Sequence, residues 1–265
     1  MALDPTRRFS DRVADYVRYR PGYPEALLRA LVEETGLGPG SRVADVGSGT
    51  GISTELLLRS GCTVFAVEPN DAMRAAAEAR LSSEPRFRSV AGTAEATGLP
   101  DAGADLVAAG QAFHWFDRER FRTECRRILR PAPGGGRVAL FWNSRQTGPT
   151  PFLRDYEALL RRFGTDYERV DHLRLGPADF EPFFGGPYLS RRFPNRQVFD
   201  FEGLRGRLLS SSYTPGPGHP DHAPMLAELR RLFDRHQEGG RVRFEYDTEL
   251  HLGRVRVPAD PTPSP

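Results

Sequence analysis

The sequence contains no lysine, because all 37 of its basic residues are arginine. Without a lysine ε-amino group, no Schiff base can form with pyridoxal phosphate or with a carbonyl substrate. P-loop nucleotide sites and protein-kinase sites also depend on a lysine. The composition therefore excludes these enzyme classes.

Cysteine and long apolar runs are scarce as well. Cys62 and Cys125 are far apart in sequence and each falls in an apolar pattern, so we interpret them as buried thiols in a reducing compartment. No apolar run approaches the roughly 20 residues that span a bilayer, and Met1 to Ser10 lacks the apolar core of a secretory signal. These absences predict a cytoplasmic protein without a membrane partner.

The charge is close to balanced, at +2, and arginines are interleaved with acidic residues. A nucleic-acid-binding protein usually gathers a basic excess on one face, so we expect no nucleic-acid partner. A length of 265 residues is near the upper limit for one hydrophobic core. We expect a single domain over residues 1–257 and a disordered, proline-rich tail over 258–265.

Short apolar runs alternate with helical patterns in the first half of the chain. The predicted strands are Arg42 to Val46, Thr63 to Val67, Phe87 to Val90, Leu106 to Ala109 and Val138 to Trp142. Helices are predicted over 52–58, 71–81 and 119–129. This order indicates an α/β fold with a doubly wound, mostly parallel sheet that is buried on both faces.

The pattern changes after Asn143. Helices are predicted near 152–163 and 223–236, and a strand over Gln197 to Phe201. Val242 to Leu252 alternates apolar and polar residues, which is typical of an edge strand.

A glycine-rich loop joins the first strand to the first helix of this pattern, and its residues of interest are Asp45, Gly47, Ser48, Gly49 and Gly51. Glycines in such a loop let the backbone turn tightly and approach a ligand closely. The dinucleotide fingerprint would place its third glycine at position 52, which is isoleucine here. The spacing therefore argues against a nicotinamide cofactor, although that alternative stays open.

An acidic residue follows the second strand, in the tripeptide Val67-Glu68-Pro69. A carboxylate at this end of the neighbouring strand lies beside the first loop and can accept hydrogen bonds from both hydroxyls of a ribose. Loop and acid together predict a nucleoside-containing ligand. A polar loop follows the weak third strand and contains Thr93, Ala94 and Glu95. It either contacts the edge of an adenine ring or is only a loop with a helix cap at Thr93.

These motifs, taken in order, resemble the class I S-adenosylmethionine-dependent methyltransferases, over about Val43 to Asn143. Asp105 to Phe116 resembles the motif on the fourth strand of that family, beside the reacting methyl group. The segments Tyr19 to Pro24 and Ala112 to Asp117 resemble the small-molecule branch near the trans-aconitate methyltransferases. Relatives often carry aspartate where this chain has Thr93, which is a departure from the pattern.

The resemblance implies a seven-stranded Rossmann-like sheet with an antiparallel edge strand and a helical cap. It implies a donor-binding core over 37–145, and a cap and acceptor region over 1–36 and 146–240. The implied cofactor is S-adenosyl-L-methionine, the acceptor is a small molecule, and the assembly is a monomer or a homodimer.

Aromatic residues follow the fourth strand, where the reacting methyl should lie. A sulfonium favours aromatic faces over water, so Phe113, Trp115 and Phe116 are expected beside it. His114 is the candidate general base, because an imidazole can take a proton from a hydroxyl or amine. The alternative is that His114 only fills space, and a carboxylate acceptor would need no base.

The N-terminal segment is expected to fold over the donor. There Arg20 pairs with the donor carboxylate, and Tyr16 or Tyr19 lines the pocket, unless the segment is an ordinary surface helix. Gln111 and Asn143, each near the end of a central strand, are candidate polar contacts, and Arg145 is a candidate partner for an acidic acceptor.

His219 and His222 have a spacing that suggests a metal, but proline and glycine surround them and we expect a loop without a metal. Three alternative functions stay open beside methyl transfer to a small molecule. These are a nicotinamide-dependent oxidoreductase, a non-catalytic donor-binding module and a methyltransferase with a macromolecular substrate.

Overall fold

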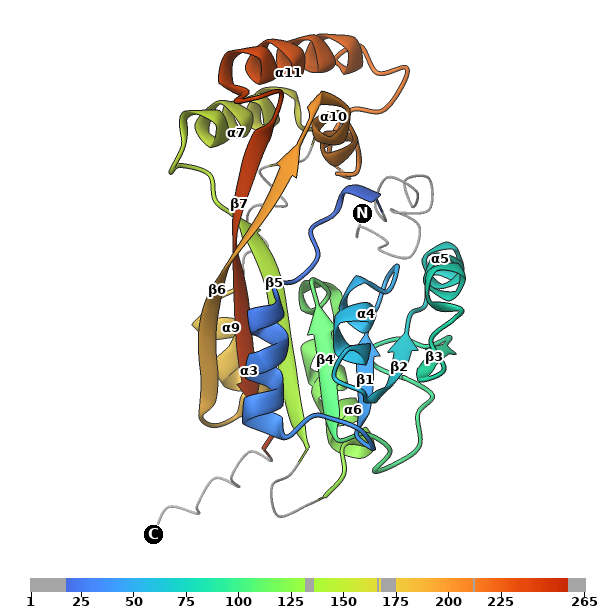
Figure 1. Ribbon diagram of the computed structural model, residues 1–265. Helices are drawn as coiled ribbons and strands as arrows, with labels where there is room; N and C mark the ends of the chain where they lie inside the picture. Colours follow the sequence, from blue (N-terminus) through green and yellow to red (C-terminus); the bar gives the residue numbers. More distant parts are fainter. Residues whose placement is uncertain (1–17, 132–135, 166, 168–174, 212, 257–265) are drawn as a thin grey trace.

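The computed structural model describes residues 18–131, 136–165, 167, 175–211 and 213–256. Its centre is a seven-stranded sheet in the order β3-β2-β1-β4-β5-β7-β6 (Figure 1). Five strands run parallel, namely β1 (Arg42–Val46), β2 (Thr63–Val67), β3 (Phe87–Val90), β4 (Leu106–Gly110) and β5 (Arg137–Arg145). Strand β7 (Val242–Gly253) is antiparallel to β5, and β6 (Tyr188–Phe199) is antiparallel to β7. The predicted mostly parallel, doubly wound sheet is confirmed.

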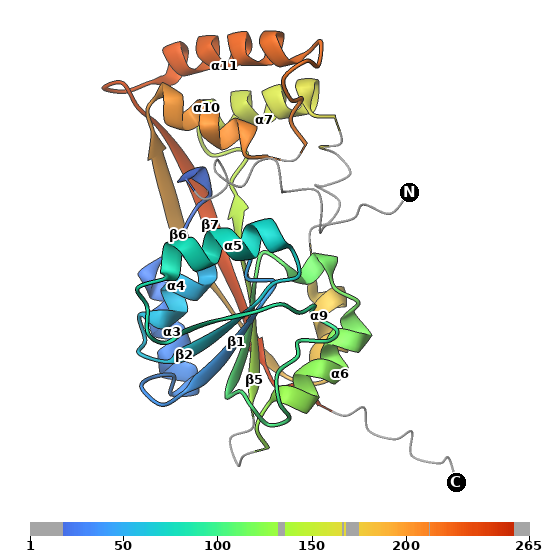
Figure 2. The same ribbon diagram turned by 90° about the vertical axis from the view of Figure 1, so that its right-hand side faces the viewer.

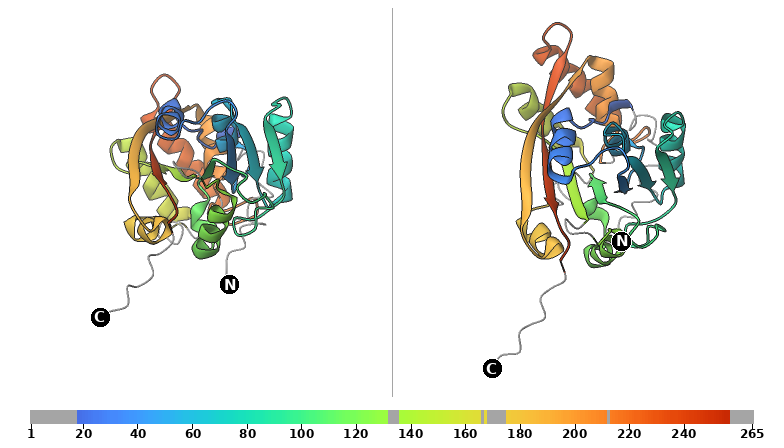
Figure 3. Two further views of the ribbon diagram at one scale, coloured as in Figure 1. Left: turned by 90° about the horizontal axis from the view of Figure 1, so that it is seen from below. Right: turned by 60° about the horizontal axis from the view of Figure 1, so that its bottom comes forward.

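Helices cover both faces of this sheet, so each face has its own hydrophobic cluster. Helices α3 (Glu25–Thr35) and α4 (Ile52–Leu58) pack on one face, and α6 (Arg118–Ile128) and α9 (Pro177–Phe184) pack on the other. Figure 3, seen from below, shows α3 in blue and α6 in green on opposite sides of the strands. Helix α5 (Asp71–Leu81) lies beside β3 and α4. Burial on both faces explains why the parallel strands read as continuous apolar runs.

The second half of the chain builds a helical cap with a third cluster. Its helices are α7 (Pro151–Phe163), α10 (Phe201–Leu209) and α11 (His222–His236), which pack with the side chains of Phe244 and Tyr246 on β7. Figures 1 and 2 show these helices beyond the carboxyl end of the parallel strands. Strands β6 and β7 reach them because each has 12 residues, about 40 Å of chain.

Two expectations about the antiparallel strands were wrong in extent or position. The strand expected at Gln197 to Phe201 begins at Tyr188, and Phe201 instead starts α10. Val242 to Leu252 was expected at the edge, but β7 lies one strand inside it and β6 is the edge. Pro194 fits this order, because proline is tolerated in an edge strand whose N–H faces solvent.

The two cysteines are buried and free, and they lie in the clusters on opposite faces of the sheet. This separation excludes a disulfide between them. Among the described residues, no helix combines the length and hydropathy that a membrane crossing requires. Tyr16 and the tail over 258–265 lie outside the described residues.

Candidate active site

The glycine loop turns sharply at the end of β1. Gly47 has φ 68°, and a Cβ atom there would lie 2.6 Å from the Cβ of Ala112 in the loop after β4. A side chain would therefore meet both an unfavourable backbone conformation and a collision. Glycine at 47 is what lets the loop lie against the neighbouring loop while its backbone faces the cavity.

Asp45 lies behind this loop and does not line the cavity. Its side chain is fully buried, and Oδ2 accepts hydrogen bonds from Ser53 Oγ at 2.7 Å and Thr54 Oγ1 at 2.6 Å. Burial raises the pKa of Asp45 to about 6, against the effect of these two hydrogen bonds. Asp45 thus joins β1 to the first turn of α4. Our prediction of a direct donor contact at Asp45 does not match this position.

Glu68 extends from the end of β2 towards the glycine loop. Its Oε2 accepts a hydrogen bond from Gly49 N at 2.9 Å, and its Oε1 accepts one from Asn70 N at 2.9 Å. Burial raises the pKa of Glu68, and these two backbone hydrogen bonds oppose the shift. Each carboxylate oxygen keeps further acceptor capacity, so Glu68 is held in place and can still accept ribose hydroxyls.

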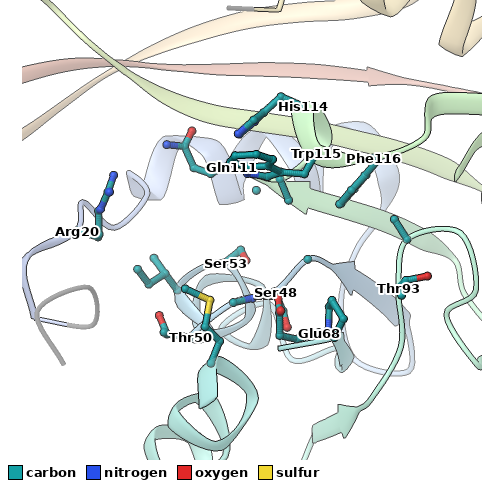
Figure 4. Close-up of a pocket in the computed structure, with 18 of the residues that line it drawn as sticks. Arg20, Ser48, Thr50, Ser53, Glu68, Thr93, Gln111, His114, Trp115 and Phe116 are labelled. Carbon is teal, nitrogen blue, oxygen red and sulfur yellow. Dashed lines mark hydrogen bonds between the residues drawn. The ribbon is translucent and has the colours of Figure 1, made fainter. Parts of the chain in front are cut away.

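A cavity of about 370 Å³ opens between these elements and the loop after β4. Figure 4 shows Ser48, Thr50 and Glu68 on one side, His114, Trp115 and Phe116 on the other, Arg20 at one end and Thr93 at the other end. The predicted residues that line it are Arg20, Gly47, Ser48, Gly49, Glu68, Pro69, Thr93, Ala94, Glu95, Gln111, His114, Trp115 and Phe116. Gly51 lies outside this lining, because it packs against Ala77 and Leu81 of α5.

The loop after β3 closes one end of the cavity. The backbone N–H of Thr93 donates to the carbonyl oxygen of Ala96, and the Thr93 hydroxyl accepts from the N–H of Ala96. Glu95 Oε1 accepts from the N–H of Asp117 at 3.0 Å, so this carboxylate ties the loop to the start of α6. The side chains at 93 and 95 hold the loop, and Ala94 supplies an apolar wall.

Two hydroxyls in this cavity have no hydrogen-bond partner among the described residues. They are Ser48 Oγ and Thr50 Oγ1, which are buried in the glycine loop. Buried polar atoms are normally satisfied, so these two indicate a polar ligand. A ligand with ribose hydroxyls and a charged amino acid moiety offers such partners.

The loop after β4 carries the aromatic wall. Gln111 has φ 60°, a conformation rare for residues other than glycine, and its Oε1 accepts from the N–H of Asn143 at 3.0 Å. The His114 and Trp115 rings lie 4.8 Å apart. Phe113 points away, into the core against Phe183. Of the three expected aromatic residues, Trp115 and Phe116 therefore line this cavity.

Comparison with known proteins bears on this geometry. A model of the methyltransferase domain family matches residues 44–139. An uncharacterized methyltransferase of Mycobacterium tuberculosis is 38% identical over 142 residues, which cover 54% of each chain. One of Schizosaccharomyces pombe is 32% identical over 157 residues, or 59% of this chain and 60% of that one. Residues 44–139 therefore form a methyltransferase domain.

A solved structure agrees with this assignment. A protein of Anaeromyxobacter dehalogenans, provisionally described as a type II methyltransferase, has a TM-score of 0.63 and 25% identity to this chain. The match covers 89% of this chain and 98% of that chain. The two relatives above are matched over only about half to three fifths of their length. These comparisons favour S-adenosylmethionine as the cofactor over the nicotinamide alternative.

Residues 19–23 contact both the cavity and the cap. Arg20 lines the cavity and donates to the carbonyl oxygen of Ser210 at 3.0 Å. Tyr19 instead packs against Gly206 of α10, where an added Cβ would meet its ring at 2.1 Å. Tyr23, which the sequence analysis missed, lines the cavity with its ring 4.8 Å from that of Phe141. Tyr19 is thus a cap-packing residue in this structure.

A second cavity of about 690 Å³ adjoins the first and extends under the cap. The two cavities share the lining residues Arg20, Pro21, Gln111, Ala112, His114 and Tyr213. Asn143 and Arg145, both predicted as substrate contacts, line the second cavity. The Asn143 side chain is already engaged, since it donates to Gly22 O and accepts from Asn195 and Thr248. Asn143 therefore holds the walls of the cavity together.

Arg207 and Tyr213 also line the second cavity, and the sequence gave no reason to select them. Both belong to the cap region, which carries no motif. Their sequence signal was weak, because Arg207 is one of many arginines in the chain and nothing in the cap sequence distinguishes it. Of the described residues, no group of three or more His, Cys, Asp or Glu is arranged to hold a metal.

Proposed function

We propose that this chain transfers the methyl group of S-adenosylmethionine to a small-molecule acceptor that binds under the cap. The observation that carries the proposal is the pair of adjoining cavities. The smaller one brings the glycine loop and Glu68 opposite Trp115 and Phe116, and the larger one shares His114 and Gln111 with it. One cavity suits a nucleoside-containing donor, and the other offers enclosed space for an acceptor.

The donor-binding roles follow from position. Glu68 accepts the ribose hydroxyls, the backbone of 47–50 faces the donor, and the Thr93 to Glu95 loop borders the adenine. Arg20 binds the donor carboxylate. When bound, the donor supplies an activated methyl group on a positively charged sulfur, and Trp115 and Phe116 stabilise that charge.

Orientation and exclusion of water are the main contributions of the protein. Holding the two reactants in line contributes about 7–11 kcal/mol at most in well-oriented systems. Residues shared by both cavities, Gln111 and His114 among them, lie where the reacting atoms meet. Gln111 follows β4 with a positive φ, and its side-chain oxygen accepts a hydrogen bond from the N–H of Asn143 on β5, which connects the two strands at this junction.

For His114 we propose a role other than that of a general base. Burial lowers the pKa of His114 to about 4, so the ring is neutral near pH 7 and is a weak base. We therefore propose that it orients the acceptor as a hydrogen-bonding group. Acceptors that need little or no deprotonation fit this site best.

Calorimetry with S-adenosylhomocysteine tests the donor site. Replacing Glu68 by glutamine removes the charge that accepts the ribose hydroxyls, and hydrogen bonds to charged groups contribute about 1.5–3 kcal/mol. We expect Glu68→Gln to weaken binding about 10- to 100-fold, and the exposed Glu119→Gln to leave it unchanged. No binding by the wild-type protein, or preferential binding of NADH, contradicts the proposal.

Transfer of labelled methyl to a panel of acids, alcohols and amines then tests the reaction. Donor binding without any transfer would indicate a non-catalytic module, and transfer only to RNA or protein would indicate a macromolecular substrate. The single domain over 1–257 with its core and cap regions, the monomeric or homodimeric state and the cytoplasmic location stay predictions.

A further inference from the structure

Arg207 carries a buried charge in the wall of the larger cavity. Its side chain, on α10, is 6% exposed. Its Nε donates to Tyr246 Oη at 3.3 Å and its Nη1 donates to Ser211 Oγ at 3.1 Å, so both partners are neutral. Across the described ranges, no carboxylate forms an ion pair with Arg207. A guanidinium stays protonated in proteins, so this charge persists.

Arg145, near the end of β5, has unused hydrogen-bonding capacity in the same cavity. Its Nη2 donates to Glu157 at 2.5 Å and to Tyr167 Oη at 2.9 Å. Its Nη1 is buried and has no hydrogen-bond partner among residues that the structure describes. Glu157 also pairs with Arg161 and accepts from Tyr167, so this carboxylate is shared by several donors.

The acidic residues of this cavity do not neutralise Arg207. Asp247 and Glu249 lie 3.8 Å from the guanidinium of Arg192 and pair with it. They alternate with Tyr246 along β7, so they point to the opposite face of the strand from the Tyr246 ring that contacts Arg207. The cap end of the cavity therefore has an excess of positive charge. A buried charge without an opposite charge is unfavourable unless a ligand supplies one.

We propose that Arg207 and Arg145 bind a carboxylate of the acceptor molecule at the cap end of the larger cavity. This proposal rests on the proposed function and adds the substrate class. The planar guanidinium suits the two oxygens of a carboxylate, and the hydroxyl groups of Tyr167 and Tyr246 lie beside the two arginines. Neither arginine lines the donor cavity, so the carboxylate is an anchor. The atom that receives the methyl group lies at the other end, near His114.

The first experiment measures binding of carboxylates to the protein saturated with S-adenosylhomocysteine. The probes are mono- and dicarboxylates of four to nine carbons, including succinate and 3-phenylpropanoate, each with its neutral amide. We expect some carboxylates to raise the melting temperature in a dose-dependent way and their amides to have no effect. Equal effects of acid and amide, or no carboxylate binding while S-adenosylhomocysteine still binds, would overturn the proposal. Loss of S-adenosylhomocysteine binding would instead contradict the proposed function.

Variants assign the effect to the two arginines. Arg207→Met should weaken carboxylate binding at least tenfold, and Arg207→Lys should give an intermediate loss, because it keeps the charge but not the planar fork. Arg205→Met is the matched control, since Arg205 lies two residues away on α10 and pairs with Glu202 at the surface. We expect its carboxylate binding to equal that of the wild type.

The stability of the unliganded protein separates a binding role from a structural one. A charge kept for a ligand is unfavourable in the empty cavity, so Arg207→Met should leave the melting temperature unchanged or raise it. A lower melting temperature with unchanged carboxylate binding would assign Arg207 a structural role and overturn the proposal. If Arg207→Met does not fold, Arg145→Lys answers the same question, and undiminished carboxylate binding by that variant counts against the anchor.

Discussion

Acid should destabilise this protein through His251, a buried histidine on β7. Its side chain is 8% exposed, and neither ring nitrogen has a hydrogen-bond partner among the described residues. The centroid of this ring lies 4.2 Å from that of Phe180 and 5.0 Å from that of Trp142, and the rings are stacked. Burial in this aromatic stack lowers the pKa of His251 to about 4, because the charged form of a ring that is shielded from water is unfavourable.

The direction of the pH effect follows from this lowered pKa. The unfolded chain takes up a proton at His251 near pH 6.5, whereas the folded protein does so only near pH 4. The stability that the neutral ring provides is therefore complete above pH 6.5 and is lost as the pH falls towards 4. The loss is about 2 kcal/mol at pH 5 and about 3 kcal/mol below pH 4.

The assay is urea or thermal unfolding of wild type and His251→Phe at pH 7 and pH 5. Phenylalanine keeps the stack and removes the titrating group, so the variant should lose about 2 kcal/mol less than the wild type between these pH values. That difference corresponds to about 4–8 °C in melting temperature. The exposed His219→Asn is the control and should lose as much as the wild type. An equal acid loss in His251→Phe and wild type would refute the reasoning.

Three further predictions concern the active site. Gly47→Ala should abolish S-adenosylhomocysteine binding, because the added Cβ would lie 2.6 Å from the Cβ of Ala112. Gly40→Ala is the control: its φ is 89° and an added Cβ has nothing within 4 Å, so it should only lower the free energy of unfolding by about 1 kcal/mol. Wild-type affinity in Gly47→Ala would contradict the packing argument. Asn143→Ala should lower the free energy of unfolding, measured in urea, by about 2–3 kcal/mol, since several buried hydrogen bonds are lost. A change below about 0.5 kcal/mol, which is typical of surface substitutions, would contradict this prediction. His114→Ala should lower methyl transfer far more than donor binding, and unchanged turnover would remove His114 from the mechanism.

The donor half of the fold could be predicted from the sequence because its signals are local. Each parallel strand is a short apolar run, and the glycine loop and Glu68 follow directly after two of them. Parallel strands bring their carboxyl ends to one edge, so residues such as Glu68 and His114 line the same cavity although they are far apart in sequence. The predicted donor residues gather at one cavity for this reason, apart from Asp45 and Gly51.

The cap could not be predicted to the same depth. Strand β6 contains Pro194 and exposed arginines, a pattern that does not indicate a strand, and it forms only because β7 pairs with it along its length. Tyr19 and Tyr23 have similar sequence surroundings, yet one packs on Gly206 and the other lines the donor cavity. Arg207 has only a weak sequence signal, because its importance depends on burial and on which charges surround it.

The three hydrophobic clusters separate the packing of the cap from the packing of the sheet. The cap helices pack into a cluster of their own, while the glycine loop and Glu68 rest on the clusters that flank the sheet. Side chains on α10 or α11 can therefore be exchanged, and the acceptor chamber resized, while the donor seat keeps its shape. We expect substitutions on α10 and α11 to change the acceptor cavity with little effect on the fold around the glycine loop.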